Sequence, residues 1–443
     1  MKSIFLLAIT HAIVCNSMNA QRVWSLRECL DYAIEHNLDV KTQAIACEKQ
    51  KIKLSTSKNS RLPSLNVSAY QKFDFGRSLT YNNTYENLTT RTTSLSMSTT
   101  VPLFTGFRIS HQIKMDRMAL ESCVFDSEKL KNDVKLNVAI AYYQILYDKE
   151  SLRVLERQVT IDSTLVERMQ QKRNAGKVGA AEVSQQFETL SKSKMQEVPC
   201  RNTLRTDLLL LVQLLNLPTI EGFDIVNPSL NVDSLVLENP SQVYEEALLS
   251  WPKILSGRSK LSEKRISIQL AKSDLYPQVS LNGGIGTSYY VTTGYENKSF
   301  TNQFKNNFGQ QIYIELSVPI FNRFYTRNNI QKTRFDYKTQ QLAVEKIKNE
   351  LYKEIQKVYC DGVNAKAKYE SSLASKNSCE EAFKLMERKY ESGSSILTEL
   401  NESKKQLLEA ESNMLQAKYE FYCKSRLLLF YKNGVLKNGR NEL

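Results

Sequence analysis

The hydrophobic residues of this chain follow two different periods along the sequence. In residues 26–58 and 241–274 they recur every three or four positions, which predicts two amphipathic helices. After each of these segments the period falls to two, and it returns to a helical period further on. Each half of the chain is therefore predicted to run in the order helix, strand, loop, strand, long helix, break and return helix.

The segments of period two predict four strands of ten or so residues, each with one apolar and one polar face. Their apolar residues are Leu65, Val67, Ala69, Phe73 and Phe75, then Leu95, Met97, Val101 and Leu103, then Val279, Leu281 and Ile285, and finally Ile312, Ile314, Leu316, Val318 and Ile320. This alternation is typical of a lipid-exposed barrel wall, and it also fits a soluble sheet packed on helices. The loops expected at 76–92 and 288–308 are polar and aromatic, which suits an extracellular rim.

Two very long helices are predicted after the strands, over residues 106–174 and 323–392. At 1.5 Å per residue the first would be roughly 100 Å long. Glycine-containing breaks at 175–177 and 392–394 end both helices, as a glycine after a helix C-terminus should. Return helices follow at about 180–217 and 397–432. Apolar residues of the last helix, such as Leu400, Leu407 and Met414, recur every seven positions, which predicts coiled-coil packing. Asp162 occupies a position in the apolar seam of the first long helix.

The two halves of the chain repeat each other in sequence. Residues 101–104 read Val-Pro-Leu-Phe and residues 318–321 read Val-Pro-Ile-Phe, and the same offset aligns Gly176 with Gly393 and Glu182 with Glu399. We therefore predict two structural repeats, 21–228 and 229–443, that form one elongated domain. With 15 Gly and 9 Pro in 443 residues, the composition permits such long helices.

The first twenty residues predict a secretory signal peptide. Lys2 supplies the positive start, residues 4–14 form the short apolar stretch, and Met18-Asn19-Ala20 offers a cleavage site before Gln21. Cys15 is a weak lipidation candidate, because the bulky Val14 precedes it. No later stretch has the about 20 apolar residues that a membrane-spanning helix needs. If the chain crosses a membrane, it does so with strands.

Charge and cysteine content exclude two other classes of protein. The net charge is +13, yet its 60 Lys and Arg residues are interleaved with 47 Asp and Glu residues, so we expect no nucleic-acid partner. Of the eight cysteines, seven follow the signal peptide, and their wide spacing matches no zinc or disulfide framework. We interpret them as small, mostly buried helix residues.

No constellation in the sequence predicts catalysis. Only His36 and His111 remain after signal cleavage, and no metal-ligand spacing, nucleophile motif or phosphate loop is present; the glycines of 283–286 lie within a predicted strand. We predict no enzyme activity, no cofactor and no metal.

The strand number constrains the assembly. Four strands cannot close a barrel, and an open sheet edge is not tolerated in lipid because its backbone groups would be unpaired. If the strands span a membrane, several chains must share one barrel. Two chains would fill its interior with side chains, and three would begin to leave a lumen.

The ordered set of motifs across the mature chain resembles the TolC-type outer-membrane channel family. The residues that carry the resemblance are 101–106 and 318–321, the opening segment 26–38, Arg61-Leu62-Pro63-Ser64-Leu65, and the breaks at Gly176 and Gly393. The resemblance implies a fold of long coiled-coil helices that form a periplasmic helical barrel, with four strands per chain in a shared transmembrane β-barrel. It also implies a homotrimer that extends from the outer membrane into the periplasm. Such a channel passively exports small molecules or proteins as the exit duct of a tripartite efflux pump or type I secretion system, with a periplasmic adaptor and an inner-membrane pump as partners.

The resemblance also suggests functional positions. The adaptor-docking hairpin tips would be Gly176, Lys177, Gly393 and Ser394. The family pattern after the second break places acidic residues at the narrowed tunnel end, where this chain has Thr398 and Asn401 instead. Candidate gate residues are therefore Glu182, Thr398, Glu399, Asn401 and Glu402. A carboxylate ring would attract cations, although acids at helix starts are equally well explained by the helix dipole.

A second hypothesis is a soluble, exported coiled-coil adaptor or scaffold with a small water-exposed β domain. The two hypotheses differ in whether the apolar face of residues 312–320 meets lipid.

Overall fold

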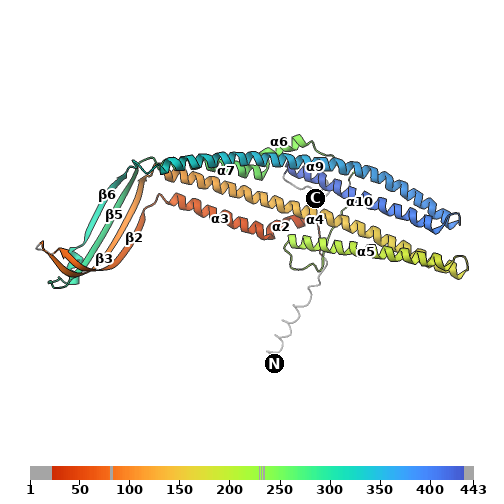
Figure 1. Ribbon diagram of the computed structural model, residues 1–443, viewed down its shortest axis with the longest axis horizontal. Coiled ribbons are helices and arrows are strands. Elements are labelled where there is room, and N and C mark those ends of the chain that lie inside the picture. The colour runs from red at the N-terminus through yellow and green to blue at the C-terminus, as the bar shows by residue number, and fades with distance from the viewer. Residues whose placement is uncertain (1–21, 80–82, 229, 231, 233–234, 434–443) are drawn as a thin grey trace, which may run out of the picture. The chain divides into compact units, whose positions relative to one another are not determined.

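The computed structural model describes residues 22–79, 83–228, 230, 232 and 235–433 (Figure 1). The predicted signal peptide, with Cys15, lies outside these residues. The chain forms two units, one of Met1–Ile45, Phe125–Leu255 and Lys346–Leu443, and one of Ala46–Val124 and Ser256–Glu345. None of the described helices is both long and apolar enough to cross a membrane.

A four-stranded sheet belongs to the second unit. It consists of β2 (Ser64–Leu79), β3 (Tyr85–Phe104), β5 (Gln278–Thr292) and β6 (Gly309–Ser317), all antiparallel, in the order β2-β3-β5-β6 (Figure 1). The two hairpins of the repeats thus pair through β3 and β5. Among the described residues, β2 and β6 have no further partner strand, so each leaves one open edge.

The strand register gives this sheet two chemically different faces. Opposite residues of paired strands share a face, and Leu65 lies opposite Thr99, Val67 opposite Met97, and Leu281 opposite Ile314. What we call the apolar face carries Leu65, Val67, Ala69, Phe73, Phe75, Leu95, Met97, Val101, Val279, Leu281, Ile285, Ile312, Ile314 and Leu316. The polar face carries the intervening hydroxyl and amide residues, with bonds such as Thr100 Oγ1 to Asn282 Oδ1 at 2.8 Å.

The strands are longer than the predicted loops allow. The alternation expected to end at 76 continues to Leu79 in β2, and β3 already begins at Tyr85. In the second hairpin, β5 continues to Thr292, and the connection contains the short helix α8 (Phe300–Asn306). The buried Gln303 holds α8 against β5 by bonding both the N–H and the carbonyl of Tyr290. Conversely, Val318 and Ile320 lie beyond the end of β6.

Each predicted opening helix is two helices in the structure. In the first half, α2 (Leu26–His36) and α3 (Leu38–Asn59) are separated at Asn37, whose side-chain oxygen accepts bonds from the N–H groups of Asp39 and Val40. Asn37 thereby caps the second helix. In the second half, α6 (Pro240–Ser250) and α7 (Pro252–Ser273) are separated at Trp251, because the residue before a proline avoids the helical conformation.

The long helices confirm the pattern predicted from the sequence. They are α4 (Arg108–Asn174) and α9 (Tyr325–Glu391), followed by the return helices α5 (Ala180–Leu214) and α10 (Leu397–Asn433). Apart from the short β1 (Arg22–Trp24), β4 (Phe223–Ile225) and α8, the second half repeats the element order of the first.

The main core of the first unit surrounds a two-stranded parallel pair that the sequence did not predict. Here β1 (Arg22–Trp24) pairs with β4 (Phe223–Ile225). The hydroxyl of the buried Tyr142 on α4 donates to the carbonyl of Val226 at 2.8 Å, which ties the pair to the long helix. The remaining core consists mainly of aliphatic and aromatic side chains of α2, α4, α5 and α10.

A disulfide joins α3 to α4 in the second unit, between Cys47 and Cys123, whose Cα atoms are 5.6 Å apart. Our interpretation of the cysteines was wrong for this pair. The two residues are 76 positions apart in sequence, and only the antiparallel packing of α3 against α4 brings them together. In the same helix pair, the buried Asp116 accepts a bond from Gln112 Nε2 at 2.9 Å and pairs with Lys53 at 3.4 Å.

Candidate functional site

Both long helices end in the same hydrogen-bonded turn. Gly176 donates its N–H to the carbonyl of Arg173 and Lys177 donates to that of Lys172. In the second hairpin Gly393 donates to Tyr390 and Ser394 to Lys389. This pair of bonds is the Schellman motif, which satisfies two terminal carbonyls and places one residue in the left-handed conformation. The two glycines have φ values of +70° and +79°, a conformation that favours glycine at both positions.

The predicted tip residues lie at these turns and are all exposed. Gly176 and Lys177 stand between α4 and α5, and Gly393 and Ser394 stand between α9 and α10. A Cβ atom added to either glycine would meet no atom within 4 Å. The tips are therefore open surfaces whose shape is fixed by backbone hydrogen bonds.

The two hairpin ends contact each other. Met169, Val183 and Leu397 form a small buried cluster, against which Tyr390 packs. The hydroxyl of Tyr390 donates to Met169 Sδ at 3.3 Å, and Lys172 Nζ lies 4.9 Å from the centre of the Tyr390 ring. Burial, followed by the charge of Glu182, raises the pKa of Tyr390. The cluster holds the end of one hairpin against the end of the other.

Four of the five candidate gate residues are exposed: Glu182, Thr398, Glu399 and Glu402. Glu399 and Glu402 form local hydrogen bonds: Glu399 accepts from Ser395 Oγ at 2.6 Å, and Glu402 accepts from Gln406 Nε2 at 3.4 Å. Within one chain these carboxylates remain in contact with water and do not form a cluster.

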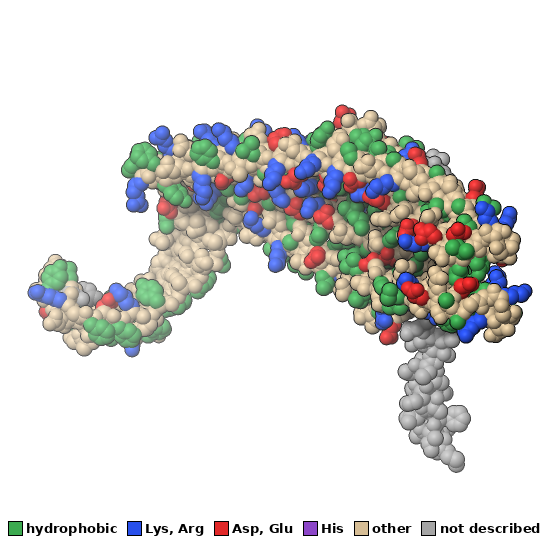
Figure 2. All heavy atoms as spheres, turned by 45° about the vertical axis from the view of Figure 1, so that its right-hand side comes forward, with side chains coloured by type: hydrophobic (Ala, Val, Ile, Leu, Met, Phe, Trp, Pro, Cys, Tyr) green, Lys and Arg blue, Asp and Glu red, His purple; other side chains and the backbone are tan. Residues whose placement is uncertain are grey.

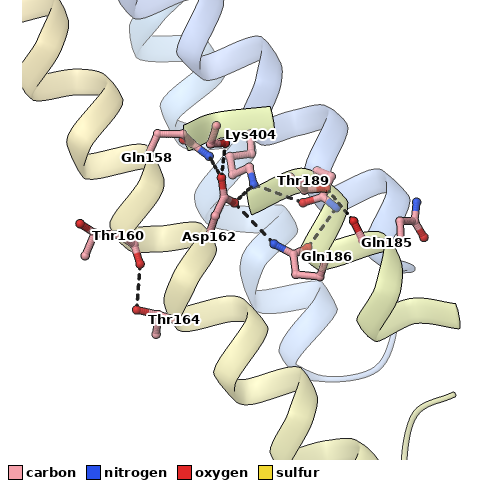
Figure 3. A network of polar contacts seen from close by, with 10 residues as sticks. Gln158, Thr160, Asp162, Thr164, Gln185, Gln186, Thr189 and Lys404 are labelled. Atoms are coloured by element: carbon pink, nitrogen blue, oxygen red, sulfur yellow. Dashed lines mark hydrogen bonds and ion pairs between the residues drawn. The ribbon is translucent and has the colours of Figure 1, made fainter. Parts of the chain in front are cut away.

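Next to them lies a buried polar network that joins α4, α5 and α10 (Figure 3). Its centre is an ion pair between Asp162 of α4 and Lys404 of α10, which are 0% and 5% exposed. Asp162 also accepts bonds from Gln158 Nε2 at 3.0 Å and Ser193 Oγ at 2.6 Å. Gln186 Nε2 of α5 lies 3.5 Å from the other carboxylate oxygen. The charge of Asp162 is thus compensated from three helices.

Asn401 is the one gate candidate that belongs to this network. Its amide donates to Gln186 Oε1 at 3.3 Å, and Lys404 Nζ donates to its carbonyl oxygen at 3.3 Å. An amide at this position bridges a buried amide and a cation, which a second carboxylate could not do in the same way. Asn401 therefore has a structural role in this network.

Asp162 was expected in the seam of α4, whereas its partner Lys404 was not predicted. The signal was present, because Leu397, Leu400, Lys404 and Leu407 follow the 3–4 spacing of a coiled-coil seam, and Lys404 is a charged residue in that seam. Two charged seam residues of opposite sign on neighbouring helices are a pattern that could have predicted the pair. Over the part of the chain that the structure describes, no group of three or more His, Cys, Asp or Glu residues could hold a metal ion.

Fold and site together define a class of protein: a duplicated chain that presents two glycine-capped helical hairpins from long helices and carries an amphipathic sheet with two open edges. The family model of the outer membrane efflux proteins matches residues 29–217 and 243–428. The chain belongs to this family. It is an efflux protein of the outer membrane.

Solved structures share the whole fold at low sequence identity. The CmeC outer membrane channel of Campylobacter jejuni is 16% identical and has a TM-score of 0.78, covering 94% of this chain and 87% of its own. A membrane protein from Pseudomonas aeruginosa is 17% identical, with a TM-score of 0.77 and coverage of 92% and 91%. The open-state MtrE outer membrane channel of Neisseria gonorrhoeae is 18% identical, with a TM-score of 0.73 and coverage of 92% and 88%. No curated protein matches the chain.

Proposed function

We propose that this protein is a homotrimer that serves as the outer-membrane exit duct of a tripartite pump, together with a periplasmic adaptor and an inner-membrane pump. The observation that carries the proposal is the four-stranded sheet with open edges at β2 and β6. In lipid these edges need partners, since unpaired backbone groups are too costly there. Pairing β2 of one copy with β6 of the next gives twelve strands for three copies, enough to leave a lumen.

The hairpin tips are the proposed adaptor-docking surface. Gly176 and Lys177 in one tip, and Gly393 and Ser394 in the other, are exposed and held by identical backbone bonds. Rigid, glycine-capped turns suit recognition by shape, because little conformational entropy is lost when a partner binds them.

The proposed periplasmic gate consists of Glu182, Thr398, Glu399, Asn401 and Glu402. The exposed carboxylates of three copies would give a ring of negative charge that favours cations. Asn401 would act differently, because it belongs to the buried network with Gln186 and Lys404.

We further propose that the repeats divide at residue 228. The two family matches, 29–217 and 243–428, fall on either side of this boundary. The region before residue 21 is proposed to be removed on export.

Two measurements test the duct. First, the protein extracted from outer membranes should run as a heat-modifiable oligomer of three chains; a monomer in the soluble periplasmic fraction would refute the proposal.

Second, planar-bilayer recordings should show a conductance that is cation-selective. Glu399→Gln and Glu402→Gln should reduce that selectivity, whereas Glu188→Gln, which removes an exposed acid paired with Lys192, should leave it unchanged. Equal ion selectivity in all variants would show that Glu399 and Glu402 are not gate residues.

The docking surface is tested by photo-cross-linking in cells. A photoreactive residue at Lys177 or Ser394 should capture the adaptor, and the same residue at the exposed Lys338 on α9 should not. Capture from Lys338 alone would contradict the assignment.

A further inference from the structure

All acidic residues of the sheet lie on its polar face, whereas basic residues lie on both faces. The four strands carry six charged residues: Lys72, Asp74, Arg77, Glu86, Arg91 and Glu315. Register places both acidic and basic residues on the polar face, where Lys72 Nζ pairs with Asp74 at 2.7 Å. The apolar face carries only Arg77 and Arg91, because Arg91 lies opposite Phe73 and Arg77 lies opposite Asn87.

Both arginines are exposed and lack a carboxylate partner within the described chain. Neither forms an ion pair there. Arg77 contacts the ring of Tyr85 on the same face, with its Cζ atom 5.6 Å from the ring centre. Glu86, the nearest acid in β3, lies on the other face and accepts a bond from the Tyr295 hydroxyl at 3.0 Å. An uncompensated positive charge therefore remains on a surface that is otherwise apolar.

The height of these arginines along the strands matches a membrane boundary. On β3 the apolar face runs from Val101 to Arg91, ten residues, or about 34 Å along the strand. With a strand tilt of about 40° this corresponds to roughly 26 Å perpendicular to the membrane, close to the about 25 Å of a barrel's apolar band. Arginine is poorly tolerated at the middle of that band and well tolerated at its edge. Arg91 thus falls at the edge, and Arg77 lies beyond it, near the β2–β3 loop.

Aromatic side chains accompany the arginines at this level. Phe73 and Phe75 precede Arg77 on β2 and are 55% and 77% exposed, and their rings stack on each other with centres 6.5 Å apart. Aromatic residues gather at the interface between lipid tails and headgroups. Figure 2 shows basic and hydrophobic side chains together at the end of the sheet. The surface combines an apolar anchor for tails with a positive charge at headgroup level.

We propose that Arg77 and Arg91 form a binding surface for the phosphate-bearing headgroups of outer-leaflet lipids. A guanidinium presents planar paired donors that match phosphate oxygens. The two arginines lie on adjacent strands with a sequence offset of four residues, which separates their Cα atoms by about 14 Å. They can therefore bind either one headgroup with two phosphates or two neighbouring headgroups. The proposal rests on the channel function only in that the sheet lies in the outer membrane.

The test measures lipid selectivity. The intact oligomer is reconstituted into phosphatidylcholine vesicles with a trace of spin-labelled phosphatidic acid, whose headgroup is a bare phosphate, or of spin-labelled phosphatidylcholine. The motionally restricted fraction of each label gives the preference for the phosphate headgroup. Each arginine is expected to favour an anionic headgroup about fivefold at its own site, so the average over all boundary lipids should be about twofold. This preference should fall towards one in 1 M salt, because exposed charges are screened.

The double variant Arg77→Gln/Arg91→Gln should lose the preference, and Arg77→Lys/Arg91→Lys should keep most of it. Lys72→Gln is the matched control, since it removes a positive charge from the same strand at nearly the same height on the opposite face. A parent protein without an anionic preference would overturn the proposal, whether or not the variants assemble. An equal loss in the double variant and in Lys72→Gln would do so as well.

Conductance of the same vesicles separates this proposal from the proposed function. Normal conductance with no lipid preference refutes the headgroup surface alone. A lipid preference without conductance supports the surface and refutes the duct.

Discussion

The ion pair between Asp162 and Lys404 should be the most sensitive point of the helical hairpins. Both side chains are almost completely buried, so solvent screening does not weaken their interaction. Removing one partner of such a pair leaves an uncompensated charge and typically costs about 3–5 kcal/mol. The two partners should not be equivalent, because they have different numbers of other contacts.

Lys404→Met should fall at the lower end of this range. After it, Asp162 still accepts bonds from Gln158 and Ser193. Asp162→Leu should fall at the upper end, because it leaves Lys404 with only Asn401 and removes the acceptor of Gln158, Ser193 and Gln186. The double variant Asp162→Leu/Lys404→Met should lose less stability than the sum of the two single losses, since no buried charge remains.

Hydrogen exchange measures the effect locally. Amides of α4 near residue 162 and of α10 near residue 404 should exchange roughly 100-fold faster in Lys404→Met, the equivalent of about 3 kcal/mol, and faster still in Asp162→Leu. Arg157→Met is the control, because Arg157 pairs with Glu411 across the same two helices but is itself 57% exposed, and its loss should change exchange less than about fivefold. Unchanged exchange in Lys404→Met, or strictly additive losses in the double variant, would refute the argument.

Three further predictions follow from individual residues. The double variant Cys47→Ser/Cys123→Ser should destabilise the α3–α4 pair by up to about 4.5 kcal/mol, the entropy of closing a loop this long. Hydrogen exchange measures the loss, with Cys360→Ser, which removes an exposed free thiol, as the control; equal exchange in both variants would argue against the bond. Gly176→Ala and Gly393→Ala should each cost about 1 kcal/mol of stability through backbone strain alone, because the surrounding space is open. Asn at either position should cost less than Ala, as measured by hydrogen exchange of the amides at the end of the preceding helix. Burial, followed by the neighbouring Asp207 carboxyl group, raises the pKa of Asp148 to about 7, above its unfolded value. The folded state therefore disfavours the carboxylate, and stability present at pH 4 should decline as the pH rises to about 7. Asp148→Asn should flatten this profile, and an unchanged thermal unfolding profile between pH 5 and pH 8 would contradict the assignment.

Much of the fold was predictable because it depends on local sequence. The change from a period of 3.6 to a period of two identified all four long strands, and the glycines at 176 and 393 identified the ends of both long helices. The two breaks that were not predicted also have local signals. Pro252 disfavours a helical conformation at Trp251, and Asn37 is a residue type that caps helices.

The candidate site was less predictable than the fold. The exposed tips follow from the helix breaks, and the structure places Gly176, Lys177, Gly393 and Ser394 there. The gate candidates came from a family pattern, and the structure shows that Asn401 differs from its exposed neighbours because it contacts Gln186 and Lys404.

The sequence by itself determined the duplication, the periods, the turns and the face of each strand. These properties depend on residues within a few positions of one another, or on a fixed offset between two copies. Tertiary structure decided which elements meet. Asp162 contacts Lys404 across 242 residues, Cys47 bonds to Cys123 across 76, and β3 pairs with β5, which joins the two hairpins into one sheet. The physical reason is that such pairings depend on how whole helices and strands pack, and a periodic pattern specifies a face without specifying its partner.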